Sequence, residues 1–245
     1  MRIDRLLCEL NIGSRSAVKE LLKKGQVCVN GQVVKKADTK VDENTAVVTC
    51  QGKEFRYRPY VYYMLNKPAG VITATKDDTE KTVMDLFREA YLCSHEDLSG
   101  IPYKEMFPVG RLDKDTVGLL LLTNDGELSH NLLSPKKHVD KKYLVHLNGI
   151  ISDEDADRLR AGVDIGEGDI TAPSILERDV NDLSKCFLTI TEGKFHQVKR
   201  MFQAVGLKVI YLKRVSMGSL VLDENLSEGA IRELTMEEVD SLKRG

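Results

Sequence analysis

Phe107-Pro-Val-Gly-Arg-Leu-Asp-Lys-Asp-Thr-Val-Gly-Leu-Leu-Leu-Leu-Thr123 is the stretch of sequence that decides the fold. Its second half, residues 117–123, is a nearly continuous apolar run, which is typical of a strand buried on both faces of a sheet. The loop before it contains Arg111, Leu112 and Asp113. In extended chain successive side chains point to opposite sides, so Leu112 would point inward while Arg111 and Asp113 point to the other side. The stretch therefore predicts a central strand with a carboxylate held at the rim of its sheet.

Strand and helix patterns alternate on both sides of this stretch. Apolar runs and alternation predict strands at 61–65, 71–75 (the hairpin partner of the first), 143–147, 187–191, 209–212 and 220–222. Helical spacing and caps predict helices at 83–90, 127–133, 153–161 after the cap Ser152, and 195–205, and one at the C-terminus capped by Thr235 and Glu238. Residues 93–106 resemble a loop. The mixture indicates an α+β fold with a mixed, mostly antiparallel sheet.

The first fifty residues form a separate pattern. Their leading apolar residues have the spacing of one helical face: Ile3, Leu6, Leu7 and Leu10. Ser14 is a good N-cap for a second helix, and the alternation of Val27 and Val29 up to Asn30-Gly31 is a strong hairpin signal. Residues 51–59 fit a linker, so we predict a small domain over 1–58 and a larger one over 59–245.

Charge is distributed unevenly between these two parts. The 245 residues carry 36 basic and 38 acidic side chains, a net charge of −2. Residues 1–60 hold 12 Lys and Arg against 7 Asp and Glu, about +5, which leaves about −7 for the rest. A local basic surface attracts polyanions whatever the net charge of the whole chain.

Composition and missing motifs exclude several classes of function. Five widely spaced cysteines, none in a Cys-x-x-Cys pair, argue against a disulfide framework and fit a reducing cytosol. No apolar run approaches the ~20 residues that span a bilayer, and the start lacks the apolar region of a signal peptide. Glycine-rich nucleotide loops, His-Glu-x-x-His and Gly-x-Ser-x-Gly are absent, and the five histidines lack metal-ligand spacing. We therefore expect neither a metal nor an organic cofactor.

Three polar groups remain as candidates for chemistry. They are Asp113 in its loop, the basic run at 136–142 before Tyr143, and the helix start at 195–200, where Lys199 and Arg200 fall off the apolar face. An aromatic beside cations suits base stacking next to phosphate contacts. Each also has an ordinary structural explanation: a turn aspartate satisfied by nearby N–H groups, a solvated charge run, and a basic helix surface.

Taken together, the motifs resemble two known families. The helix pair with Ser14-Arg15 and Gly25-Gln-Val-Cys-Val-Asn-Gly31 is similar to the S4-type RNA-binding domain. Leu-Asn-Lys-Pro-x-Gly (65–70), Gly-Arg-Leu-Asp-x-Asp-Thr-x-Gly-Leu-Leu (110–120), Lys-x-Tyr-x-Val (141–145) and Glu-Gly-Lys-Phe-His-Gln-Val-Lys-Arg-Met (192–201) resemble S4-domain ribosomal RNA pseudouridine synthases. The His-Gln-Val-Lys-Arg-Met form is most similar to the small-subunit enzymes. Two departures are Phe195, where Tyr or Asn is common, and a longer insertion around 93–106.

This resemblance implies a role for each site residue. Asp113 would act at the ribose C1′ of the target uridine, Tyr143 would stack on the flipped base and take part in proton transfer, and Lys199 would pair with Asp113. Arg111 would help to hold the RNA. The further RNA contacts implied are Arg2, Arg5, Arg15, Lys19, Lys23, Lys24, Lys141, Lys142, His196, Gln197 and Arg200.

The implied activity is isomerisation of uridine to pseudouridine at one site of 16S ribosomal RNA, uridine-516, in the cytoplasm. The partner would be small-subunit rRNA or an assembly intermediate, with no membrane, no small-molecule cofactor and a monomeric enzyme. Two alternatives stay open: a synthase that acts on a 23S rRNA hairpin, and a non-catalytic RNA-binding factor of ribosome assembly.

Overall fold

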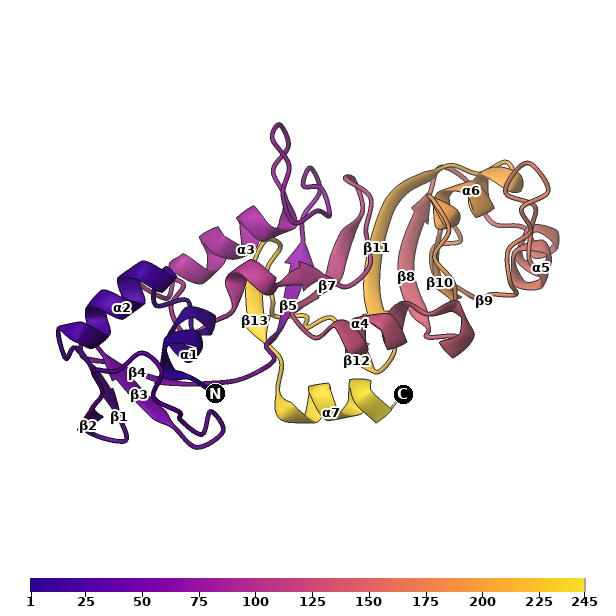
Figure 1. Ribbon diagram of the computed structural model, residues 1–245. Coiled ribbons are helices and arrows are strands. Elements are labelled where there is room, and N and C mark those ends of the chain that lie inside the picture. The colour runs from indigo at the N-terminus through magenta and orange to yellow at the C-terminus, as the bar shows by residue number, and fades with distance from the viewer. Residues whose placement is uncertain (245) are drawn as a thin grey trace. The chain divides into compact units, whose positions relative to one another are not determined.

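The computed structural model describes residues 1–244, and the chain forms two compact units (Figure 1). The first comprises Met1–Val61 and Tyr91–Met106, and the second comprises Tyr62–Ala90 and the residues from Phe107 onward. Gly245, the last residue of the predicted larger domain, lies outside the described residues. The domain boundary at residue 58 stays a prediction; the structural units differ from it mainly by the inserted segment Tyr91–Met106.

The first unit contains two helices and a four-stranded antiparallel sheet. The helices are α1 (Ile3–Glu9) and α2 (Arg15–Lys23), and Ser14 caps α2 by accepting a hydrogen bond from the Ala17 N–H. The strands are β1 (Val27–Val29), β2 (Gln32–Val33), β3 (Val47–Cys50) and β4 (Lys53–Arg56), in the order β2-β1-β3-β4. The predicted helical face is confirmed, because Ile3, Leu6 and Leu7 are fully buried in one core with Val27 and Val48.

The predicted linker at 51–59 is wrong in its first half. Gln51 and Gly52 have φ of 52° and 80°, and this left-handed pair closes a tight hairpin between β3 and β4. The polar alternation of Lys53–Arg56 is that of a half-exposed edge strand, which resembles a linker in composition.

The segment Tyr91–Met106 packs within the first unit, although it lies between two elements of the second. The Gly100 N–H donates to the Leu10 carbonyl at 2.6 Å, and Asn11 Nδ2 donates to the Leu98 carbonyl at 3.1 Å. Ile101 is only 2% exposed. These contacts give the longer insertion noted in the sequence a structural role in the first unit.

The second unit is built on a nine-stranded sheet. Its main order is β13-β5-β7-β11-β8-β10-β9, with β12 paired to β11 and β6 to β7. The strands are β5 (Tyr62–Lys67), β6 (Phe107–Pro108), β7 (Val117–Thr123), β8 (Lys141–Leu147), β9 (Ile175–Arg178), β10 (Lys185–Ile190), β11 (Val209–Met217), β12 (Leu220–Val221) and β13 (Ile231–Glu233). Among the strands of residues 1–244, only β7 and β11 pair in parallel, so the predicted mixed, mostly antiparallel sheet of an α+β fold is confirmed.

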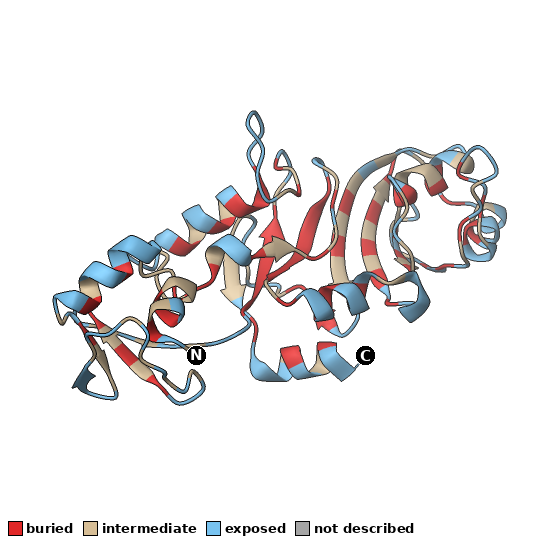
Figure 2. Ribbon diagram, viewed as in Figure 1, coloured by how far each residue is buried: buried red, intermediate tan, exposed pale blue. Residues whose placement is uncertain are grey.

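Helices cover both faces of the sheet where β5 and β7 lie, which is why these two strands are buried along their whole length (Figure 2). Leu128 of α4 (Gly126–Leu133) and Val239 of α7 (Met236–Arg244) share a core with Met64 of β5. Tyr63 points the other way and meets Phe87 of α3 (Val83–Leu92) edge to face at 5.0 Å. Two further helices, α5 (Asp153–Ala161) and α6 (Gln197–Ala204), lie beside β8, β9 and β10 at the other end of the sheet (Figure 1).

The predicted hairpin of 61–65 with 71–75 is wrong. β5 pairs instead with β7 and β13, and Ile72 makes only an isolated bridge to Thr82. Residues 71–75 are held by tertiary contacts rather than by a ladder, because Thr73 bonds to the loop before β7. Strands β9 and β13 were not predicted, and both lie at edges of the sheet.

Close packing between β7 and β11 explains a glycine in the middle of the buried run. Gly118 has a φ of 100°, and a Cβ added there would lie 2.3 Å from the Arg214 carbonyl oxygen. A side chain at this position would therefore force the two strands apart. Because the Asp113 loop leads directly into β7, this contact also fixes where that loop ends.

Candidate active site

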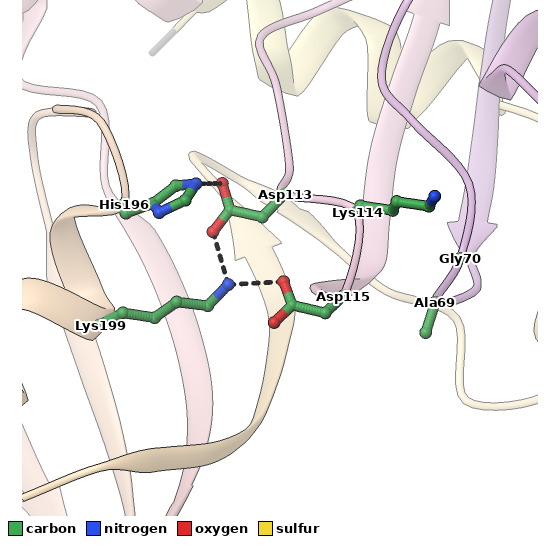
Figure 3. Close-up of a pocket in the computed structure, with 7 residues that line it drawn as sticks. All are labelled: Ala69, Gly70, Asp113, Lys114, Asp115, His196 and Lys199. Carbon is green, nitrogen blue, oxygen red and sulfur yellow. Dashed lines mark hydrogen bonds and ion pairs between the residues drawn. The ribbon is translucent and has the colours of Figure 1, made fainter. Parts of the chain in front are cut away.

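A pocket of about 430 Å³ lies at the rim of the large sheet. It is lined by residues from three places, the turn after β5, the loop before β7 and the start of α6: Ala69, Gly70, Asp113, Lys114, Asp115, His196 and Lys199 (Figure 3). The sheet brings these segments together because β5 and β7 are neighbours and α6 packs beside β11. Three of the predicted motifs, 65–70, 110–120 and 192–201, thus meet in one cavity.

Lys199 connects two carboxylates in this pocket (Figure 3). Its Nζ donates to Asp113 Oδ2 at 2.9 Å and to Asp115 Oδ1 at 2.5 Å. Partial burial by itself would lower the pKa of Lys199, but the hydrogen bonds that its ammonium donates to Asp113 and Asp115 outweigh this effect, so the net shift of the pKa is upward. Burial likewise acts to raise the pKa of Asp115, and the Lys199 ammonium reverses this to a net lowering. Lys199 is therefore held as a cation beside Asp113.

His196 approaches Asp113 from the other side. Its Nε2 lies 3.5 Å from Asp113 Oδ1, and its backbone is left-handed with a φ of 50°. The imidazole stacks on the Phe195 ring, with centroids 3.9 Å apart and planes inclined by 15°. Asp113 thus has one oxygen facing an ammonium and the other facing an imidazole, while about a quarter of its side chain stays open to the pocket.

The loop that carries Asp113 is held from below by a buried lysine. Lys67, at the end of β5, has no exposed surface, and its Nζ donates to the carbonyls of Thr116 at 2.9 Å, Pro68 at 3.0 Å, Asp113 at 3.1 Å and Lys114 at 3.4 Å. Burial lowers the pKa of Lys67 to about 8, an effect that Asp115 and Asp113 partly offset. Its ammonium ties three carbonyls of the 113–116 loop to the end of β5.

Further hydrogen bonds fix the flanks of the same loop. The Thr73 hydroxyl donates to the Leu112 carbonyl at 2.8 Å and accepts from the Leu112 N–H at 3.1 Å. The Gly70 N–H donates to the Lys114 carbonyl at 2.8 Å. Asp113 therefore stands on a loop whose backbone is bonded on both sides, the arrangement that a precisely positioned catalytic group requires.

Among the predicted site residues, Asp113, Lys199 and His196 are brought together. Tyr143 is 8% exposed on β8, opposite Leu188 of β10 and Arg214 of β11, and is not one of the residues that line the pocket. Arg111 is exposed, two residues before Asp113.

Two predicted RNA contacts are buried. Lys141 is 7% exposed and its Nζ donates to the Val139 carbonyl at 2.8 Å. Gln197 is 4% exposed, and its amide donates to Glu192 and accepts from the Lys194 N–H. Both side chains are therefore engaged in hydrogen bonds inside the protein.

The other predicted contacts are on the surface, several with acidic partners. Arg2 pairs with Asp4, Arg5 pairs with Glu9, and Lys142 pairs with Glu177. Arg200 instead donates to the backbone carbonyls of Ile165 and Phe195. On α2, four cations are exposed: Arg15, Lys19, Lys23 and Lys24. Lys23 lies 3.5 Å from Glu20.

Asp115 and Lys67 were not predicted as site residues. Asp115 lies within the 110–120 motif, but no feature of the neighbouring sequence distinguishes a carboxylate that shares Lys199 with Asp113 from a carboxylate exposed to solvent. Lys67 had a visible signal, since a lysine directly after an apolar strand and before a proline cannot easily reach water. Within residues 1–244, no three side chains of His, Cys, Asp or Glu gather as metal ligands, and no helix has the length and apolar character to cross a bilayer.

Known proteins resemble this chain over its whole length. It is 49% identical over 244 residues to the uncharacterized RNA pseudouridine synthase YtzG of Bacillus subtilis strain 168, covering 99% of this chain and 98% of the relative. It is 40% identical to ribosomal small subunit pseudouridine synthase A of Vibrio vulnificus, over 99% of both chains. A crystal structure of pseudouridylate synthase superposes with a TM-score of 0.66 at 34% identity, also over 99% of both chains.

Two families also match separate parts of the chain. Residues 61–204 match RNA pseudouridylate synthase, and residues 1–47 match the S4 domain. The chain therefore belongs to the RNA pseudouridylate synthase family and begins with an S4 domain, as the motifs predicted. It is an enzyme, a pseudouridine synthase that acts on RNA, and the non-catalytic alternative is set aside.

Lys67→Met should loosen the Asp113 loop. Methionine keeps the apolar stem but leaves buried carbonyls without a donor, so the free energy of unfolding should fall by about 1–3 kcal/mol. Because misplacement of a catalytic group by about 1 Å costs ~10²-fold, turnover on RNA should fall by about that factor. Denaturant unfolding and tritium release from labelled RNA measure the two effects. Lys81→Met, which removes an exposed lysine paired with Glu89, is the control and should change neither.

The same lysine predicts a pH dependence of stability. Its pKa is about 8 in the folded protein and 10.5 ordinarily, so between these values the unfolded chain binds more protons. The contribution of Lys67 to the free energy of unfolding therefore rises as the pH rises through this window. Wild type should gain stability relative to Lys67→Met between about pH 8 and pH 10. A difference that is constant with pH would contradict the assigned shift.

Proposed function

We propose that this enzyme isomerises one uridine of small-subunit ribosomal RNA, uridine-516, with Asp113 as the catalytic carboxylate. The observation that carries the proposal is the contact of Lys199 with Asp113 at 2.9 Å in a pocket lined by three pseudouridine synthase motifs. The relatives named ribosomal small subunit pseudouridine synthase A, at about 40% identity over the full chain, support the choice of RNA.

Asp113 acts at the ribose C1′ of the bound uridine. The bond from C1′ to the base nitrogen N1 breaks, the uracil rotates, and a bond from C1′ to C5 replaces it. The hydrogen on C5 leaves as a proton, and the released N1 takes up a proton. Because atoms are only rearranged, the reaction requires no external oxidant, reductant or energy source. The Lys199 ammonium donates a hydrogen bond to Asp113 and fixes its orientation, and Lys67 holds the backbone that presents it.

The remaining roles follow from the need to take the uridine out of its helix, since the reacting atoms cannot be reached in a stacked base. We assign Tyr143 to stacking on the flipped uracil and proton transfer, and Arg111 to the adjoining RNA backbone. Lys141 and Gln197 are left out of the RNA-binding set because their polar atoms bond inside the protein. Lys142 and Arg200 remain in it as partly exposed cations.

The S4 unit supplies phosphate contacts in this proposal. Its basic residues face solvent along α2, and a surface of this kind binds RNA through its phosphates without reading sequence. We expect the enzyme to work as a monomer in the cytoplasm, on small-subunit rRNA or an assembly intermediate. A 23S rRNA hairpin is the alternative substrate.

Asp113→Asn should abolish the reaction. Asparagine keeps the shape of the side chain but has no anionic oxygen, so release of tritium from [5-³H]uridine-labelled small-subunit rRNA should fall by at least about 10³-fold. Asp115→Asn is the matched control, because Asp115 shares Lys199 but is 73% exposed; its turnover should stay within about tenfold of wild type.

The alternatives are separated by the same assay. Retained turnover in Asp113→Asn would show that another group acts at C1′. Release by wild type from 23S but not from 16S transcripts, in naked RNA and in particles, would assign the enzyme to the large subunit. Sequencing of the modified transcript then tests the assignment of uridine-516.

Replacing Lys19, Lys23 and Lys24 together by alanine should weaken RNA binding through lost phosphate contacts. Each such contact releases counterions, so the slope of log affinity against log salt should become shallower by about 2 and affinity should fall by about tenfold or more. Salt titrations of a labelled transcript measure both quantities. Lys185→Ala, which removes a surface lysine of the second unit paired with Asp182, should leave them unchanged. An unaltered slope in the triple variant would place the RNA elsewhere.

A further inference from the structure

A phenylalanine ring stands in solvent beside the pocket. Phe195 is 76% exposed, the most exposed aromatic side chain among the described residues. One face of its ring is covered by His196, which stacks on it at 3.9 Å, and His196 itself contacts Asp113. The Phe195 ring is therefore connected to the Asp113 carboxylate through one intervening side chain, His196.

The backbone beneath this ring is firmly held. Arg200 Nη1 donates to the Phe195 carbonyl at 3.2 Å, and Arg200 Nε donates to the Ile165 carbonyl at 2.9 Å. The Lys194 N–H donates to Gln197 Oε1, and the Lys194 ammonium pairs with Asp169 at 2.6 Å. These hydrogen bonds and this ion pair restrain the backbone around Phe195, so its side chain has a defined position on the surface.

Such an arrangement gives up stability in two ways. An exposed phenyl ring forgoes the free energy that burial would provide, and His196 adopts a left-handed backbone that residues other than glycine rarely take. A single exposed apolar residue is ordinary on a protein surface, but this ring lies beside the pocket and on a restrained backbone, which favours a role in contact with a ligand.

The pocket indicates the class of ligand. The Phe195 ring has no hydrogen-bond donor for a phosphate. A nucleobase is flat and uncharged and stacks on an aromatic ring whatever its sequence. When a uridine leaves its helix, the neighbouring or formerly paired base loses a stacking partner.

We propose that Phe195, backed by His196, is a stacking platform for an unpaired nucleobase of the RNA next to the target uridine. The inference rests on the proposed function in placing the target uridine at Asp113. The platform replaces the stacking lost on flipping and so stabilises the open RNA, which makes Phe195 a positioning residue for the substrate.

Two substitutions at Phe195 distinguish a role of the aromatic ring from a role of any large apolar side chain. Phe195→Leu keeps an apolar side chain but has no ring, and it should raise KM and Kd for a small-subunit rRNA transcript by about 5- to 150-fold. Phe195→Tyr keeps the ring and should stay within about threefold of wild type. Val180→Ala, which truncates an 89% exposed apolar residue outside the pocket, is the control and should have no effect. Matching melting temperatures establish that all the variants are folded.

A fluorescence signal tests stacking directly. The chain contains no tryptophan, so Phe195→Trp introduces a single indole at the platform. Addition of the same transcript should quench its emission, with the midpoint equal to the Kd from anisotropy of the labelled RNA. Saturating RNA that leaves the emission unchanged would overturn the proposal.

Kinetics provide a second way to overturn it. If Phe195→Leu has wild-type KM and kcat, the ring has no role; if only kcat falls, the ring acts through His196 on Asp113 rather than on the RNA. The fluorescence readout requires binding alone, so it remains valid if Asp113→Asn proves active. Failure of the platform and failure of the proposed catalytic residue are thus seen in different measurements.

Discussion

The arrangement of the active site depends on one buried ammonium group. Lys67 ends a strand that is covered on both faces, so its charge cannot reach water and must be met inside the protein. The carbonyls that meet it belong mainly to the 113–116 loop, which therefore has to fold over the end of β5. The position of Asp113 is in this sense a consequence of how the sheet core is built.

Elements with strong local signals could be predicted from sequence. The strand at 117–123 and the helix at 153–161 have the predicted bounds, because an unbroken apolar run and a Ser152 cap with an acidic first turn leave little alternative. The motifs at 110–120 and 192–201 likewise contained the residues that meet in the pocket. The motifs do not say how far apart these residues lie in space. Only the structure therefore shows that Asp113 and Asp115 share Lys199.

The misses have physical reasons of their own. Residues 71–75 have strand composition but bond to Leu112 through one side chain, a long-range contact that periodicity does not report. Lys141 was assigned by its charge, although the period of two in β8 places it on the buried face with Tyr143 and Val145. Gln197 stands four residues before Met201 on the buried face of α6, where helical phase again outweighs polarity.

The charges of the site explain how an RNA enzyme can use a carboxylate. In the pocket, Asp113 and Asp115 share Lys199, and Lys114 pairs with Glu80, so both pocket lysines already have carboxylate partners. A phosphate would have to compete with these carboxylates for a cation, whereas a flipped uracil is uncharged and can enter without doing so. The attraction for the RNA backbone must then come from other surfaces, and residues 1–60 hold 12 basic side chains against 7 acidic ones. Under the proposed function, this separation of charge lets the basic residues of the S4 domain bind the RNA backbone while an uncharged base enters the pocket.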